Sequence, residues 1–215
     1  MDRDLRQRDI VPPDRLAKCR ATVIGVGAVG RQVALQLAAI GVPWLQLIDF
    51  DSVEEVNLAP QGFLESDLER LKVEATGDMC RQVNGQIEVY ETPSRFRRSM
   101  QIRNVVFNCV DSIEIRRLIW ESVNDQVEFY ADGRMSAEVV RVLVASDGPS
   151  RAHYPSTLFG ASEAYAGSCT AKSTIFTANI AAGLMLEQFS RWLRGLPVDS
   201  DLQLNLLSSE LTVSD

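Results

Sequence analysis

The sequence predicts an α/β fold: a mostly parallel sheet with helices on both faces and antiparallel strands toward the C-terminal part. Short apolar, β-branched runs alternate with amphipathic helical segments through at least residue 124, as in a parallel sheet covered on both sides. A glycine-rich turn joins the first strand to the first helix, which is typical of doubly wound sheets. The 215 residues suffice to bury a substantial core in one domain.

Strands are expected where short apolar runs end at polar or turn residues. In chain order these runs are 20–26, 44–48, 87–91, 105–109, 127–131 and 139–145. A last antiparallel strand is indicated by the alternating residues Leu202, Leu204 and Leu206.

Helices are expected between the strands. The first follows the glycine-rich turn and ends at Gly41, and the second ends near Val83 after a capping box formed by Ser66 and Glu69. Between the second strand and that helix we expect irregular chain over 51–63. Each helix would bury an apolar stripe against the sheet.

Two further helices are expected in the second half of the chain. One follows Asp111, with Ser112 as its N-cap and Ile115 on its inner face. The other covers 173–194 and carries apolar residues at helical spacing.

The predicted elements form a single domain, 1–215, in four parts. One part is a long loop over 147–172 without periodicity, and loops of that length are usually functional or mobile. The four parts are a helical N-terminal arm (1–19), a nucleotide-binding core (20–146), a mobile crossover loop (147–172) and a C-terminal helix with a β extension (173–215).

The charge balance excludes two classes of partner. With 22 Lys+Arg against 29 Asp+Glu the net charge is −7, which argues against a sequence-independent grip on nucleic acid or an anionic membrane surface. The N-terminus has no apolar signal core, and no apolar stretch is long enough to span a bilayer. We therefore expect a soluble, cytoplasmic protein.

The cysteines do not fit a disulfide framework or a zinc site. Cys19, Cys80, Cys109 and Cys169 are far apart, no C-x-x-C pair occurs, and the single histidine is His153. Free thiols in a cytoplasmic domain are the expected state.

A nucleotide-binding fingerprint begins at the end of the first strand. Gly25 allows the tight turn, Gly27 lets the backbone approach a ligand, and Gly30 brings helix and strand together. The helix N-terminus that follows favours an anionic group. Asp49 ends the next strand, where an acid can accept hydrogen bonds from ribose hydroxyls. The fingerprint leaves NAD and ATP both open.

The residues after this fingerprint resemble the ubiquitin-activating-enzyme superfamily, whose bacterial members include ThiF, MoeB and HesA. The resemblance covers residues 5 to about 195. The chain lacks the paired C-x-x-C zinc motif and in this resembles the short stand-alone bacterial members. It rests on Asp49-Phe50-Asp51-Ser52-Val53, Asn57-Leu58-Ala59-Pro60-Gln61, Asp67, Lys72, Arg6-Gln7, Asn108-Cys109-Val110-Asp111-Ser112 and Cys169-Thr170-Ala171.

The resemblance implies ATP-dependent adenylation of a carboxylate, typically the C-terminal glycine of a ubiquitin-like protein. It assigns Lys72 to the phosphates as a point charge and Asp111 to a Mg²⁺ ion. Asp51, Asn57 and Gln61 would help to position the nucleotide. The implied cofactors are therefore ATP and Mg²⁺.

The resemblance also implies an assembly and partners. Arg6 would reach the γ-phosphate from the other subunit of a homodimer. The partners would be a ubiquitin-like protein with a free C-terminal glycine and, in a conjugation system, a ubiquitin-conjugating-enzyme-like acceptor. Neither nucleic acid nor membrane is an expected partner.

Several of these residues also have ordinary structural interpretations. Lys72 could be a solvated helix charge, Asp111 could simply begin a helix, and Asn57 could be a turn residue. At Pro60 the family carries an arginine, and proline supplies neither a charge nor a backbone donor. Arg6, Arg134 or another basic residue would then have to replace it.

Cys169 has two interpretations that the sequence leaves open. A thiolate on a loop before a helix N-terminus could take the acyl group from the adenylate as a thioester. A small apolar side chain packed under the loop is the alternative.

Two other functions share the fingerprint. One is an NAD-dependent oxidoreductase, against which stand the short chain left for a substrate domain and the lack of a proton donor other than His153. The other is a non-catalytic nucleotide-binding module, in which Pro60 marks a lost activity.

Overall fold

A computed structural model describes residues 3–159 and 174–214 of the chain. Their strands form one eight-stranded sheet in the order β3-β2-β1-β4-β5-β6-β7-β8. The strands β1 to β5 run parallel to one another, whereas β6, β7 and β8 each pair antiparallel with the strand before them. The predicted fold class is confirmed.

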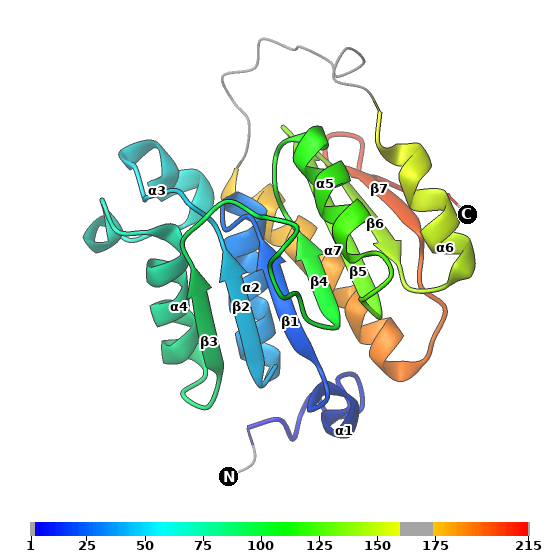
Figure 1. Cartoon of the computed structure of the whole chain (residues 1–215), viewed down its shortest axis with the longest axis horizontal. Coiled ribbons are helices and arrows are strands. Elements are labelled where there is room, and N and C mark those ends of the chain that lie inside the picture. Colours follow the sequence, from blue (N-terminus) through cyan, green and yellow to red (C-terminus); the bar gives the residue numbers. More distant parts are fainter. Residues whose placement is uncertain (1–2, 160–173, 215) are drawn as a thin grey trace.

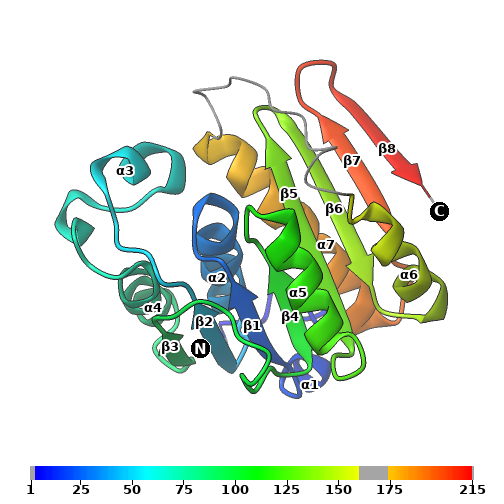
Figure 2. The same ribbon diagram turned by 45° about the horizontal axis from the view of Figure 1, so that its top comes forward.

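The bounds of the strands follow the apolar runs of the sequence in most cases. Figure 2 shows β3 at one edge of the sheet and β8 at the other. The strands are β1 (Arg20–Ile24), β2 (Trp44–Ile48), β3 (Glu88–Thr92), β4 (Val105–Asn108), β5 (Phe129–Ser136), β6 (Val139–Ala145), β7 (Asp201–Asn205) and β8 (Glu210–Ser214).

Helices cover both faces of this sheet (Figure 1). The helices α2, α4 and α7 pack on one face, and α5 with α6 and a following turn of 3₁₀ helix lie on the other. The helices are α1 (Pro13–Leu16), α2 (Ala28–Ile40), α3 (Glu55–Gln61), α4 (Lys72–Val83), α5 (Ile113–Val123), α6 (Gly148–His153) and α7 (Ile175–Arg194), with 3₁₀ turns at Glu65–Asp67 and Tyr154–Thr157.

Local signals set the helix ends that the sequence predicted correctly. Gly41 closes α2 with a left-handed backbone (φ 95°), a conformation that glycine adopts without steric cost. The hydroxyl of Ser112 accepts a hydrogen bond from the backbone N–H of Ile115 and so caps α5. Gly195 ends α7 in the same way as Gly41 ends α2.

The prediction was wrong between β2 and α4. The irregular segment 51–63 contains the helix α3, and the capping box of Ser66 and Glu69 is absent. Glu69 has a left-handed backbone (φ 66°), so the chain cannot be helical there, and α4 begins only at Lys72. An isolated antiparallel bridge between Ser52 and Leu71 draws the two ends of this segment together.

The C-terminal part also differs from the prediction. The loop expected over 147–172 begins with α6 and a 3₁₀ turn, because Asp147 and Ser150 form a capping box that starts a helix. The strand expected over 127–131 begins two residues later and is longer, as β5. The predicted last strand corresponds to β7, which forms a hairpin with a further strand, β8. The long helix begins at Ile175, with Thr174 as its cap.

Two smaller expectations were corrected as well. In the N-terminal arm only α1 is an α-helix among the described residues, and the preceding chain forms turns. Ile115 lies on the outer side of α5 with 37% of its surface exposed, while Arg116 and Trp120 take the inner positions. Within the described ranges no helix has the length and apolar character needed to cross a bilayer.

Candidate functional site

The glycine turn lies at the carboxyl end of β1 and requires its glycines. Gly25 has φ 84°, and a Cβ there would stand 2.9 Å from backbone atoms of Cys109 and Val110. A Cβ on Gly30 would overlap the carbonyl oxygen of Gly25. The turn is therefore packed so closely against the β4–α5 connection that only glycine fits at these two positions.

Asp49 fixes this turn through its carboxylate. It ends β2 and accepts hydrogen bonds from the backbone N–H of Val26 (2.6 Å) and from that of Asp51 (2.9 Å). It is 9% exposed. One oxygen thus holds the glycine turn and the other holds the chain after β2, and the ribose contact remains a prediction.

The structure brings Lys72 and Asp51 together beside Asp49. The ammonium of Lys72 is 3.2 Å from a carboxylate oxygen of Asp51, and the Lys72 side chain is only 8% exposed whereas that of Asp51 is 47% exposed. The backbone N–H of Lys72 also donates to the carbonyl of Asp51 (3.0 Å). Lys72 is therefore a buried, oriented cation at the carboxyl end of β2, which is not how a solvated helix charge is placed.

The helix α3 carries Asn57 and Gln61. The side-chain oxygen of Asn57 accepts from the backbone N–H of Glu54 (3.1 Å), which caps the helix start. The side-chain oxygen of Gln61 is buried without a hydrogen-bond partner and lies 4.0 Å from where a Cβ of Gly27 would be. Gln61 thus lies over the middle glycine of the fingerprint, while Pro60 in the same helix offers no charge and no N–H.

Asp111 lies in the short connection between β4 and α5, at the same end of the sheet. It is exposed, so its carboxylate is open to a ligand from solution. A single exposed carboxylate suits Mg²⁺, which is bound through one or two carboxylates together with phosphate oxygens and water. Within the described ranges, no three or more His, Cys, Asp and Glu side chains gather as a metal site.

A buried ionic cluster lies next to this connection. Asp132 is fully buried and forms ion pairs with Arg116 and with Arg134 (2.9 Å), and it accepts from the hydroxyl of Tyr154 (2.7 Å). Arg134 also donates to the carbonyl of Thr157 (2.8 Å). These bonds engage Arg134 within the cluster, and its role in place of the arginine missing at Pro60 stays a prediction.

Two predicted site residues do not join this group. Arg6 is exposed in the N-terminal turns, which meet Ala39 and Ile40 at the far end of α2 from the glycine turn. A helix of this length spans roughly 20 Å, so Arg6 could act only on another subunit's nucleotide. Cys169 lies outside the described residues.

The three described cysteines and His153 are held in structural surroundings. Burial raises the pKa of the Cys19 thiol to about 11 and those of the Cys80 and Cys109 thiols to about 12, so these three stay protonated. His153 lies 3.2 Å from Asp201 on β7, and that carboxylate also pairs with Arg141. His153 is thus held by an ion-pair group on β6 and β7, which β4 and β5 separate from β1 and the glycine turn.

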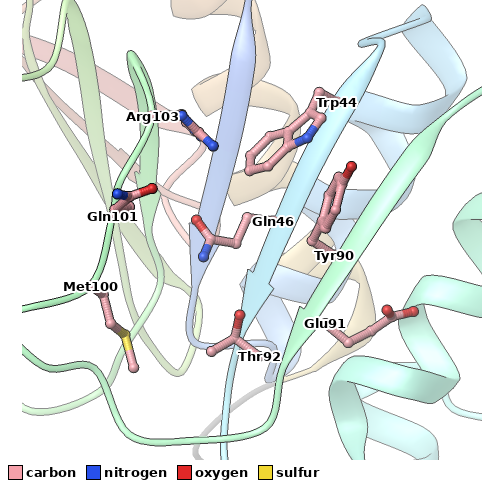
Figure 3. Close-up of a pocket in the computed structure, with 8 residues that line it drawn as sticks. All are labelled: Trp44, Gln46, Tyr90, Glu91, Thr92, Met100, Gln101 and Arg103. Atoms are coloured by element: carbon pink, nitrogen blue, oxygen red, sulfur yellow. The ribbon is translucent and has the colours of Figure 1, made fainter.

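A hollow in the described surface extends along β2 and β3 on the face that carries α5 (Figure 3). Trp44 and Tyr90 form its aromatic wall with ring centroids 4.9 Å apart, and the Arg103 guanidinium lies 5.1 Å from the Trp44 ring. The backbone carbonyl of Thr92, one of the lining residues, accepts a hydrogen bond from the backbone N–H of Asp49 (3.3 Å), so the hollow adjoins the predicted nucleotide site. The hollow runs from there toward the amino ends of the strands.

The fold is of the doubly wound α/β class, and the glycine turn, a buried lysine and an exposed aspartate lie at the carboxyl end of its parallel strands, where proteins of this class bind ligands. The sequence profile of the ThiF family matches residues 3–210. The chain belongs to the ThiF family.

Several curated proteins are similar over about half of this chain. It is 32% identical over 111 residues to adenylyltransferase and sulfurtransferase MOCS3-1 of Zea mays, covering 49% of this chain and 24% of that one. It is 29% identical over 143 residues to ubiquitin-like modifier-activating enzyme 5 of Caenorhabditis elegans (59% and 34%). It is 27% identical over 126 residues to molybdopterin-synthase adenylyltransferase of Haemophilus influenzae (56% and 52%). The matches thus span between about a quarter and a half of these relatives' length.

Solved structures confirm the fold. A structure of PaaA superimposes with a TM-score of 0.76 at 19% identity, covering 94% of this chain and 65% of that one. A structure of Escherichia coli MccB with AMPCPP and MccA gives the same TM-score at 16% identity and the same coverage. At such identities the likeness concerns the fold alone.

Proposed function

We propose that this protein is an adenylyltransferase that uses ATP and Mg²⁺ to activate the C-terminal carboxylate of a ubiquitin-like protein. The observation that carries the proposal is the buried Lys72, held by Asp51 at the carboxyl end of β2 beside the glycine turn. Membership of the ThiF family and the names of the curated relatives support it.

The chemistry needs positioning and charge more than proton transfer. A carboxylate oxygen of the partner attacks the α-phosphorus, the bond to the bridging oxygen of the β-phosphate breaks, and pyrophosphate leaves. The nucleophile is already ionised, so no general base is required. Lys72 would offset charge on the phosphates, and the N-terminus of α2 would face them. Asp111 would hold Mg²⁺, which neutralises phosphate charge when bound.

Further parts of the proposal rest on the family resemblance. A homodimer would place Arg6 of each subunit at the partner subunit's nucleotide, because Arg6 lies too far from the glycine turn of its own chain. Cys169 would accept the acyl group as a thioester before transfer to a ubiquitin-conjugating-enzyme-like acceptor. We expect the protein to act in the cytoplasm.

The test is ATP–pyrophosphate exchange with radiolabelled pyrophosphate and ubiquitin-like proteins that end in a free glycine. We expect exchange that depends on the partner and stops when the partner's terminal glycine is removed. A conjugate between the two proteins that reducing agent cleaves, and that Cys169→Ser loses while exchange persists, would support the thioester step. ATP binding without exchange for any such partner would instead favour a non-catalytic module, in line with Pro60.

A further inference from the structure

Arg31 is a buried arginine directly after the glycine fingerprint. It is the fourth residue of α2, and its own backbone N–H donates to the carbonyl of Gly27 (3.0 Å). Its side chain is directed to the far end of α3, where two guanidinium N–H groups donate to the carbonyl of Gly62 (3.2 and 2.8 Å). The next residue, Gln32, donates to the carbonyl of Gln61 (3.1 Å).

Among the described residues, no carboxylate lies within ion-pair distance of Arg31, and the charge of Asp67 acts on it only from farther away. The residue is 1% exposed, and its Nη1 atom is buried without a hydrogen-bond partner. Burial lowers the pKa of Arg31, and the negative charge of Asp67 raises it. Among the described residues, however, Asp67 forms its ion pair with Arg70 (3.2 Å). Arg31 is otherwise stabilised by the ring of Phe63, whose centroid lies 4.4 Å from the guanidinium carbon.

A buried cation of this kind is costly unless an anion or a polar network compensates it. The compensation that the described residues give the Arg31 guanidinium consists of two hydrogen bonds to the Gly62 carbonyl and the face of the Phe63 ring. The same helix end carries Gln61, whose buried side-chain oxygen also lacks a partner and lies over Gly27. Two buried polar atoms without partners are thus carried by residues that α2 and the end of α3 bring together, Nη1 of Arg31 and the side-chain oxygen of Gln61.

We propose that Arg31 is a positioning residue of the nucleotide site: it fixes the end of α3 over the glycine turn and supplies the buried positive charge that favours the triphosphate there. This inference rests on the proposed function and deepens it. It explains how the site can do without a cation at Pro60, since Arg31 provides the charge from the opposite helix. The residue acts through α3 and through its field, and it need not touch the nucleotide.

The test compares the affinities of the whole protein for adenosine and for ATP·Mg²⁺ by isothermal titration calorimetry. Arg31→Met keeps the length of the side chain and removes the charge. We expect its preference for ATP over adenosine to fall by about tenfold or more, because only the phosphates feel the lost charge. Arg31→Lys retains the charge, so its preference should stay within about threefold of the wild type.

Gln32→Met is the matched control. It removes a neutral hydrogen bond to the same helix end, so it should change both affinities by a similar factor and leave their ratio intact. If Arg31→Met shows no cooperative unfolding transition, Arg31→Gln takes its place. Glutamine also removes the charge but keeps one donor for the Gly62 carbonyl.

An unchanged preference for ATP in the uncharged variants would overturn the inference, as would an equal loss for Arg31→Lys and Arg31→Met. The proposed function would survive either result, since wild-type ATP binding is measured independently in the same titrations. If the wild type bound neither ligand, both the function and the role of Arg31 would be wrong.

Discussion

Gly30→Ala is expected to abolish ATP binding and to lower the free energy of unfolding by about 3 kcal/mol, the upper range for forcing atoms into a packed site. The added Cβ would overlap the Gly25 carbonyl oxygen and approach the Cys109 side chain to 3.2 Å. The turn would have to open, and the backbone N–H groups at the start of α2 would lose their alignment. Urea unfolding and ATP titration measure the two effects.

Gly183→Ala is the matched control for this substitution. Gly183 lies inside α7, and a Cβ there would meet no described atom within 4 Å. Alanine should therefore stabilise the protein by about 0.5 kcal/mol through its higher helix propensity and leave ATP binding unchanged. If Gly30→Ala behaved like Gly183→Ala, the tight packing of the glycine turn would be disproved.

Lys72→Met is expected to reduce the rate of ATP–pyrophosphate exchange roughly a hundredfold, about 3 kcal/mol of lost transition-state stabilisation. Methionine preserves the buried stem of the side chain, so the fold should persist while the charge beside Asp51 is lost. Exchange rates at saturating ATP, together with the KM for ATP, separate the loss of catalysis from the loss of binding.

Lys18→Met is the control for charge alone. Lys18 is exposed at the end of the N-terminal arm, next to the amino end of β1. Its removal changes the net charge of the protein by the same amount and should leave exchange within about twofold of the wild type. Similar rates for the two variants would show that the buried charge of Lys72 takes no part in the reaction.

The parallel core could be predicted because its signals are local and strong. Each inner strand is a short apolar run, and α2 begins at the glycine turn and ends at Gly41. Because parallel strands are buried on both faces, the apolar runs mark them almost residue by residue. The candidate site followed from the same pattern, since Asp49 and Asp111 come soon after β2 and β4, whose carboxyl ends lie at the same edge of the sheet on either side of β1.

The missed elements carry weak signals for physical reasons. The helix α3 has only seven residues, buries none of them and contains Pro60, so neither its length nor a buried face marks it as a helix. The strand β8 is exposed along its whole length, so its pairing with β7 leaves no apolar pattern in the sequence. The extension of β5 beyond residue 131 depends on pairing with β6, which no local pattern encodes.

Arg31 was missed because its role depends on tertiary contacts. The sequence places an arginine after Gly30, and exposure to solvent is the usual fate of such a residue. The signal that could have found it is its position in the first turn of a helix packed against a second one. Its hydrogen bonds to Gly62 appear only when α3 folds over the glycine turn.

The most direct test of the nucleotide assignment is a thermal-shift comparison of ATP·Mg²⁺ with NAD, repeated on Lys72→Met and Asp111→Ala. A ligand at a hundred times its dissociation constant adds about 2.7 kcal/mol to the stability, which such a comparison resolves. We predict stabilisation by ATP·Mg²⁺ that both substitutions weaken, and none by NAD. Stabilisation by NAD alone would contradict the adenylyltransferase assignment and would favour an NAD-dependent dehydrogenase.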